Sequence, residues 1–234
     1  IGSFSISVSI DKKLYLPLVA SDRYFPTVIL PTGGETFSSF FIIGMVVNIL
    51  IRLETPLDKE TVRKLKAGDE VRINGIIYAA RDAAHKRMIE LLHAGKGLPF
   101  DIRNQVIYYV GPCPARPGMV IGSAGPTSSY RMDAYTPELI RLGLTGMIGK
   151  GLRNDEVVSA MTEYGAVYFG ALGGAGALIA KSVVSEETIA FPELGPEALR
   201  KLHVKDFPAI VVIDSYGNDM YVIGKKNYIQ SKNQ

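Results

Sequence analysis

Residues 122–133 read Gly-Ser-Ala-Gly-Pro-Thr-Ser-Ser-Tyr-Arg-Met-Asp, and the rest of the chain is organised around them. The apolar segment 119–121 comes directly before, which predicts a strand that breaks into a loop of small residues. Gly122, Gly125 and Pro126 are typical of a turn in which the backbone approaches another group closely. None of these residues suits a hydrophobic core, so the loop is expected to carry function.

The second half of this loop carries hydroxyl and charged side chains. Thr127, Ser128 and Ser129 are residue types that cap a helix through their side-chain oxygens, and Arg131 and Asp133 follow them. Hydroxyls, free backbone N–H groups and an arginine together predict a site for a small anion. The P-loop spacing is missing, which favours a carboxylate over a phosphate chain.

The composition is that of an ordinary globular protein. The chain has 234 residues, of which 47% are hydrophobic and 21% charged, and these values predict one domain, or one domain with an appendage. A net charge of +3 without a basic cluster argues against nucleic acid as a partner. Residues 1–44 form short extended pieces, and we expect an N-terminal extension of unknown role before a domain at 45–234, with Met45 as a plausible start.

Cysteine content and hydropathy exclude several classes of protein. The sequence has one cysteine, Cys113, so it forms no internal disulfide and cannot by itself hold an iron–sulfur cluster, which needs about three or four thiolates. The longest apolar run, residues 40–51, is shorter than the roughly 20 residues that cross a membrane and lacks the features of a signal peptide. We therefore expect a cytoplasmic protein with no membrane partner and no metal site of its own.

Two further segments carry candidate functional residues. Residues 80–87 read ARDAAHKR and open a helix, with Arg81 at a helix start, where a cation is unfavourable unless an anion binds there too. The residues alone leave an anion site and a surface arginine equally open, and for His85 a structural role is favoured over a catalytic one. Lys150 lies between two glycines, but the P-loop spacing fails and it is interpreted as an ammonium group at a strand end.

The pattern of apolar and turn residues predicts an α/β fold in which the candidate residues follow strands. The expected helices are 59–66, 81–95, 136–143 and 154–164, with another ending at 180 and one opening at 195–197. The expected strands are 105–110, 119–121, 146–149, 166–169 and 207–213, together with a hairpin over 71–78 that turns at Asn74-Gly75 and a strand 221–223 paired with 207–213. The glycine-rich residues 170–176 do not match a dinucleotide-binding loop and favour close helix packing.

Three motifs resemble, in order and spacing, one known family. ARDAAHKR (80–87), GPTSSYRMD (125–133) and Gly149-Lys150-Gly151 are similar to the β subunit of the iron–sulfur class I fumarate hydratases and L-tartrate dehydratases. The resemblance covers about residues 55–207 and not residues 1–44. It implies a swivelling β/β/α domain that works with a separate α subunit, in an α2β2 assembly, where the α subunit holds a four-iron, four-sulfur cluster.

The resemblance also implies roles for individual residues. Arg81, Arg131 and Lys150 would bind the carboxylates of a dicarboxylate substrate, and Thr127 would transfer a proton at the substrate carbon, with Lys150 as a second catalytic group. His85, Ser128 and Asp133 are possible supporting residues. Tyr130 stands where members of this family have a smaller residue, which bears on the shape of the pocket.

Three functions remain as alternatives. The first is the reversible hydration of fumarate to L-malate, a hydro-lyase reaction of the tricarboxylic acid cycle. The second is L-tartrate dehydration, with the same motifs and a pocket that accepts an extra hydroxyl. The third is a non-catalytic module that binds carboxylates without a partner subunit.

Overall fold

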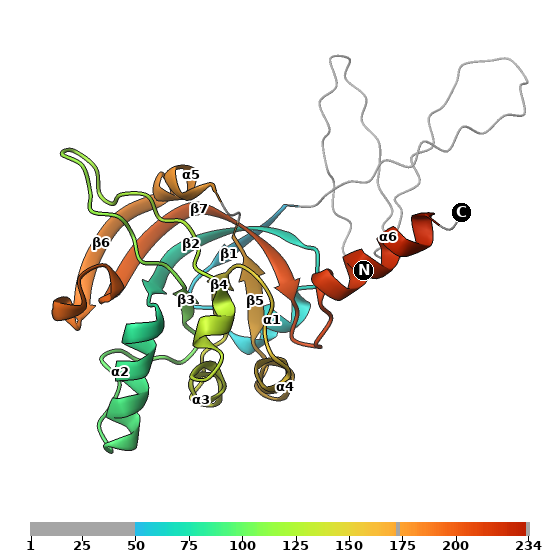
Figure 1. The fold of residues 1–234 in the computed structure, drawn as a ribbon, viewed down its shortest axis with the longest axis horizontal. Helices are drawn as coiled ribbons and strands as arrows, with labels where there is room; N and C mark the ends of the chain where they lie inside the picture. The colour runs from blue at the N-terminus through green and yellow to red at the C-terminus, as the bar shows by residue number, and fades with distance from the viewer. Residues whose placement is uncertain (1–49, 172–173, 233–234) are drawn as a thin grey trace, which may run out of the picture. The chain divides into compact units, whose positions relative to one another are not determined.

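The computed structural model describes residues 50–171 and 174–232, so the expected extension 1–44 lies outside the described residues (Figure 1). The elements in chain order are β1 (Ile51–Glu54), α1 (Lys59–Lys64), β2 (Glu70–Ala79), α2 (Asp82–His93), β3 (Val106–Tyr108), a 3-10 helix (Ser129–Met132), α3 (Thr136–Arg141), β4 (Gly146–Gly149), α4 (Asp155–Tyr164), β5 (Val167–Gly170), α5 (Gly176–Ala180), β6 (Val183–Ala190), a second 3-10 helix (Pro192–Glu197), β7 (Leu199–Ile213) and α6 (Met220–Lys232). The predicted α/β class is confirmed in this part of the chain.

One seven-stranded sheet forms the centre of the described part of the chain. Its strand order is β1-β2-β3-β4-β5-β7-β6, and β2 also pairs with β7, so that β2, β3, β4, β5 and β7 close on themselves. Neighbouring strands from β1 to β5 pair in parallel, whereas β7 runs antiparallel to β2, β5 and β6. The carboxyl ends of β2, β3 and β4 therefore meet at one edge of the sheet.

Two hydrophobic cores lie on opposite faces of the parallel strands. Side chains alternate along β3, because successive residues of a strand point to opposite faces. Val106 and Tyr108 belong to the inner core enclosed by the strands, whereas Ile107 belongs to the outer core. That outer core is completed by α2, α3 and α4, which lie in a row along one side of the sheet (Figure 1).

Several predicted helix boundaries are confirmed together with their capping chemistry. Asn154 Oδ1 accepts a hydrogen bond from Val157 N–H at 2.9 Å, and α4 ends at Tyr164, as predicted. Asp58 Oδ1 caps α1 in the same way through Thr61 N–H at 2.7 Å. These helices could be predicted because the capping contacts are local in sequence.

The predicted hairpin over residues 71–78 is wrong. The segment is one continuous strand, β2, with an irregularity between Ile73 and Gly75. At this point Thr55 N–H donates to Asn74 O at 2.9 Å, and a Cβ on Gly75 would lie 2.6 Å from Thr55 Oγ1. Gly75 has a φ of +97° and forms part of a bulge in β2, against which the end of β1 packs. It does not form the turn of a hairpin.

Of the elements expected between 195 and 223, the strand 207–213 is confirmed as the second half of β7, whereas the helix opening at 195–197 and the strand 221–223 are wrong. Residues 195–197 end a 3-10 helix rather than opening an α-helix, residues 199–213 form the single strand β7, and residues 221–223 are helical within α6. Strand β6, which the sequence did not predict, pairs with the first half of β7. The other two partners of β7, β2 and β5, come from earlier parts of the chain, so no local pattern shows these pairings.

Two expectations for the loop are not met. Residues 119–121 are not a strand, and the side chains of Met119 and Val120 are exposed. The 3-10 helix that begins at Ser129 has Ser128 at its N-cap without a side-chain hydrogen bond. The hydroxyls of this loop are therefore not used for capping.

Among the described residues, no helix combines the length and the apolar character that crossing a membrane would require.

Candidate functional site

The predicted site residues gather at one edge of the sheet. Arg81 follows β2, residues 127–132 lie beyond the end of β3, and Lys150 follows β4. Because these three strands are parallel neighbours, their carboxyl ends deliver the three segments to the same place. The expectation that the candidate residues follow strands is confirmed for Arg81 and Lys150, whereas the Thr127 loop reaches the end of β3 without the expected strand at 119–121 before it.

Arg81 lies at the N-cap of α2 and is paired with carboxylates. Its Nη2 lies 3.3 Å from Glu197 Oε1, and its side chain is only 22% exposed. Glu197 Oε2 also accepts from Ala83 N–H at 3.2 Å. A carboxylate of the chain itself therefore occupies the helix start, which provides the anion that an arginine at this position requires.

Arg131 comes to the same cluster from the loop. Its Nη2 donates to Asp82 Oδ2, and Asp82 Oδ1 lies 3.6 Å from Arg81 Nε. Asp82 Oδ1 and Arg81 Nε are both buried and have no hydrogen-bond partner among the described residues. Two guanidinium groups and a half-buried acid therefore lie together, with unsatisfied donor and acceptor atoms between them.

Thr127 and Lys150 are joined through their backbones. Lys150 N–H donates to Thr127 O at 3.3 Å, and Ser128 forms an isolated β-bridge with Lys150. Thr127 N–H is in turn bound to Tyr109 O at 2.8 Å, beyond the end of β3. Neither the Thr127 hydroxyl nor the Lys150 ammonium group forms a hydrogen bond or ion pair within residues 50–171 and 174–232, so both remain available to a ligand.

His85 is buried near the start of α2, four residues after Arg81. Its Nδ1 lies 2.8 Å from Arg81 O, and its ring meets the Tyr109 ring edge-on at 5.3 Å. Burial lowers the pKa of His85 to about 4, so the ring is neutral at pH 7. A neutral ring that donates from Nδ1 to the Arg81 carbonyl fixes the start of α2, in agreement with the favoured structural role.

This burial predicts a dependence of stability on pH. The unfolded chain binds a proton at His85 near pH 6.5, whereas the folded chain does so only near pH 4, so stability is complete above pH 6.5 and falls as the pH is lowered through this window. We expect the free energy of unfolding to be about 3 kcal/mol lower at pH 4 than above pH 6.5, and we expect His85→Gln to abolish this difference. Denaturant unfolding at several pH values measures it. The exposed His203→Gln control should keep the full dependence, and an unchanged dependence in His85→Gln would contradict the assignment.

Asp133 turns toward the interior instead of joining the arginine cluster. Its Oδ1 accepts from Arg153 Nε at 2.7 Å, and its Oδ2 accepts from Asn154 N–H at 2.8 Å. The Arg153 side chain is fully buried, and Nη2 donates to Thr136 Oγ1 at 2.9 Å. Asp133 therefore connects the end of the loop to the start of α4.

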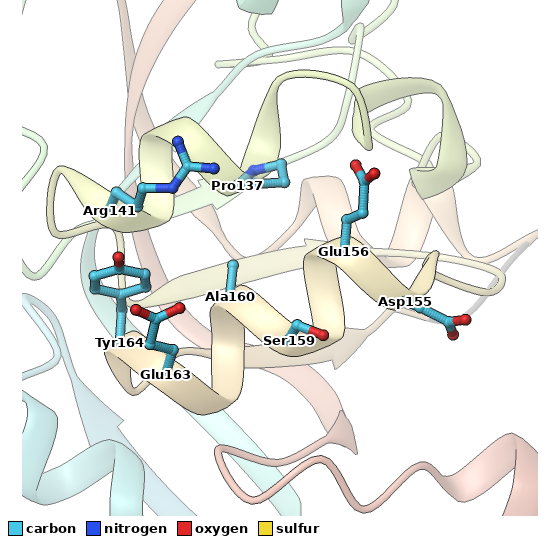
Figure 2. A pocket seen from close by; sticks show the side chains of 8 residues that line it. All are labelled: Pro137, Arg141, Asp155, Glu156, Ser159, Ala160, Glu163 and Tyr164. Atoms are coloured by element: carbon cyan, nitrogen blue, oxygen red, sulfur yellow. The ribbon is translucent and has the colours of Figure 1, made fainter.

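A hollow of about 490 Å³ lies elsewhere, on the outer surface between α3 and α4. Figure 2 shows Glu156 and Glu163 along α4 facing this hollow, with Arg141 across from them on α3. It contains none of the predicted site residues. Its carboxylates would repel an anionic ligand, so we assign the site to the strand ends.

Sequence reasoning missed several residues of this region. Asp82 stands beside Arg81 in the same motif and could have been found as its counter-ion. Glu197 and Arg153 come from distant segments and carry no local signal. Tyr168 reaches the region from β5 and reads in the sequence as an ordinary core residue.

The fold is an α/β domain in which arginine, lysine and hydroxyl side chains of the candidate residues lie at the ends of parallel strands. The family described as Fumarase C-terminus matches residues 42–224, and the chain belongs to this family.

Two relatives show how the similarity is distributed. "Fumarate hydratase 2" of Leishmania major is 34% identical over 227 residues, which cover 93% of this chain and 39% of that relative. The "Putative L(+)-tartrate dehydratase subunit beta" of Methanocaldococcus jannaschii is 43% identical over 179 residues, covering 74% of this chain and 92% of that relative. The first alignment reaches into residues 1–44, contrary to the expectation that the resemblance excludes them.

A third relative, "Fumarate hydratase class I, aerobic" of Escherichia coli K12, is 41% identical over 151 residues, or 64% of this chain and 28% of the relative. The chain thus spans well under half of the two proteins named fumarate hydratase and nearly all of the one named as a β subunit.

Proposed function

We propose that this chain is the β-subunit part of a class I hydro-lyase that reversibly hydrates fumarate to L-malate. The observation that carries the proposal is the convergence of Arg81, Arg131 and Lys150 with the Thr127 hydroxyl at one edge of the sheet. Fumarate is a dianion with two planar carboxylates, and arginine matches this shape through paired N–H groups. The names of the relatives support the same reaction class.

Each residue has a distinct role in the proposed reaction. Arg81 and Arg131 bind carboxylates of the substrate, and Lys150 adds a third positive charge. Hydration adds a hydroxyl group to one alkene carbon and a proton to the neighbouring carbon, and Thr127 transfers that proton. A threonine hydroxyl is a weak acid and a weak base, so it depends on surrounding groups for activation. Among the cationic residues of the site, Lys150 forms a backbone hydrogen bond with Thr127. Ser128 and His85 support these residues through the backbone.

The residues of this chain do not fit a four-iron, four-sulfur cluster. Such clusters are held by about three or four thiolates, and Cys113, the one cysteine of the sequence, is exposed. The described residues also contain no group of three or more His, Cys, Asp or Glu that could hold a metal ion. The proposal therefore assigns the cluster to a separate α subunit in an α2β2 assembly.

Three finer assignments accompany this function. The sheet is of the swivelling β/β/α type, which is supported by a parallel part covered by helices and an antiparallel part built on β7. Residues 45–234 form the family domain, which is supported by the family match from residue 42. The complex is cytoplasmic and acts in the tricarboxylic acid cycle.

L-tartrate dehydration is the second candidate. It is favoured by the Methanocaldococcus relative, of which this chain covers 92%. The exposed Tyr130 lies between Thr127 and Arg131 and is a candidate for shaping the pocket. Turnover of fumarate and L-tartrate by the same assembled complex distinguishes the two reactions.

Arg131→Met tests the carboxylate role. We expect the KM for fumarate to rise at least tenfold, because a charge-assisted contact of about 1.5–3 kcal/mol is lost, and kcat to change less. Initial rates of the assembled enzyme measure both constants. Arg141→Met, which removes an arginine from the hollow between α3 and α4, is the matched control and should leave KM unchanged. An unchanged KM in Arg131→Met would exclude Arg131 from substrate binding.

A further inference from the structure

Two hydroxyl groups meet in the interior below Thr127 and Lys150. Ser129 Oγ lies 2.8 Å from the Tyr168 hydroxyl, and both residues are fully buried. Ser129 begins the 3-10 helix that carries Arg131, whereas Tyr168 lies in the middle of β5. The contact therefore joins the functional loop to a central strand.

The direction of these hydrogen bonds follows from the number of hydrogens. The Tyr168 hydroxyl also lies 3.0 Å from Gly151 O, a group that can only accept. Burial raises the pKa of Tyr168, so its hydroxyl stays protonated at neutral pH, and its single hydrogen goes to Gly151 O. Ser129 must then donate to Tyr168, which gives a one-way chain from Ser129 through Tyr168 to Gly151.

Together with two backbone hydrogen bonds, this series of hydrogen bonds forms a ring that includes Lys150. Ser129 N–H donates to Lys150 O at 2.9 Å, and Lys150 N–H donates to Thr127 O. Tyr168 then ties Ser129 to Gly151, the residue after Lys150. The segments 127–129 and 149–151 are thus held together by backbone bonds on one side and by the two hydroxyls on the other.

The packing leaves little room for adjustment in this ring. A Cβ on Gly149 would lie 2.0 Å from Ser129 Oγ and 2.9 Å from a ring carbon of Tyr109. The Arg153 guanidinium lies over the Tyr168 ring, 5.1 Å from its centroid, and fixes the ring from the α4 side. The Tyr168 ring is therefore closely packed, and its hydroxyl bridges the two segments.

We propose that Tyr168 is a positioning residue that, through Ser129 and Gly151, holds Lys150 in register with Thr127 for proton transfer. The inference deepens the proposed function and rests on it. Tyr168 does not touch the substrate. Its effect on the rate arises because Lys150 and the Thr127 hydroxyl lie on separate segments whose relative position Tyr168 holds. Misplacement of reacting groups by about 1 Å can lower the rate by about 10²-fold.

Tyr168→Phe in the assembled enzyme tests this role, because it removes one oxygen and keeps the ring. We expect kcat to fall at least tenfold and KM to change less than threefold when rates are measured well below Tm, where all of the enzyme is folded and lost stability alone does not lower kcat. Ser129→Ala should give a similar loss. The double variant should be no worse than the poorer single variant, because both act through one chain of hydrogen bonds.

Tyr108→Phe is the matched control. Tyr108 is fully buried on β3, two strands from β5 in the sheet, and its hydroxyl likewise donates to a backbone carbonyl, but to that of Ala124 rather than that of Gly151. We expect this variant to keep its kcat. Normal kcat in Tyr168→Phe, a loss confined to KM, or an equal loss of kcat in Tyr108→Phe would each overturn the proposal.

A second measurement separates this inference from the proposed function. In the isolated 234-residue chain, hydrogen exchange at the Ser129 and Lys150 amides should be slow and should accelerate in Tyr168→Phe but not in Tyr108→Phe. If the assembled wild-type enzyme converted neither fumarate nor tartrate, the proposed function would fail while this structural link could still hold. Exchange rates unchanged by Tyr168→Phe would show that the hydroxyl does not hold the segments, whatever the reaction.

Discussion

Thr127→Ala in the assembled enzyme is expected to lower kcat by about 10²–10⁴ and to leave the KM for fumarate nearly unchanged. The substitution removes no charge and no hydrogen bond made by the side chain among the described residues, so binding and folding should survive. The backbone bonds of Thr127 with Tyr109 and Lys150 do not involve the side chain and are retained. A loss of kcat would therefore report on the hydroxyl alone.

Thr127→Ser provides the matched control for this experiment, because it restores the hydroxyl without the methyl group. It should recover most of the lost rate, and steady-state kinetics on both variants measure the comparison. If Thr127→Ala kept a near-normal kcat, Thr127 would serve only the structure of the loop. The proton-transfer role would then pass to a group on the partner subunit.

The largest expected effect on stability comes from Arg153→Met. The fully buried Arg153 guanidinium binds Asp133 and Thr136, and the rings of Tyr109 and Tyr168 lie 5.3 Å and 5.1 Å from it. Removing it leaves the Asp133 carboxylate buried without its counter-ion, which costs about 3–5 kcal/mol. We expect Tm to fall by roughly 10 °C in thermal unfolding of the isolated chain.

A surface pair of the same chemistry is the control for this prediction. Arg103 donates to Asp101 at 2.6 Å, but both side chains are well exposed, so Arg103→Met should change Tm little. The double variant Arg153→Met with Asp133→Leu should regain part of the loss, because no isolated charge remains. Equal Tm values for Arg153→Met and Arg103→Met would contradict a structural role for the buried pair.

The candidate site could be predicted from the sequence to the extent that its chemistry is local. Arg81 at a helix start, Lys150 at a strand end and the loop at Thr127 each carry their signal within a few residues. Their gathering at one edge follows from parallel strands, a property of the fold class. The roles of Thr127 and Lys150 remain predictions, because no ligand contact tests them.

The residues that the sequence could not supply act over long separations. Glu197 follows Arg81 by more than a hundred residues in the chain, and it reaches the start of α2 only because β7 folds back along β2. The same strand explains the wrong hairpin and the wrong helix, since β2 and β7 are each longer than their local turn residues suggest. Tertiary pairing overrides turn propensity where a strand has partners on both edges.

The most direct test of the central claim is the rate of fumarate hydration by this chain with and without a cluster-bearing α subunit. The proposed function predicts that the purified chain alone, after anaerobic treatment with iron and sulfide, holds no stoichiometric cluster and does not consume fumarate, because one thiol cannot hold the cluster. It predicts that activity arises when the α subunit is added. Hydration by the isolated chain, or a cluster-containing complex that converts neither fumarate nor L-tartrate, would contradict it.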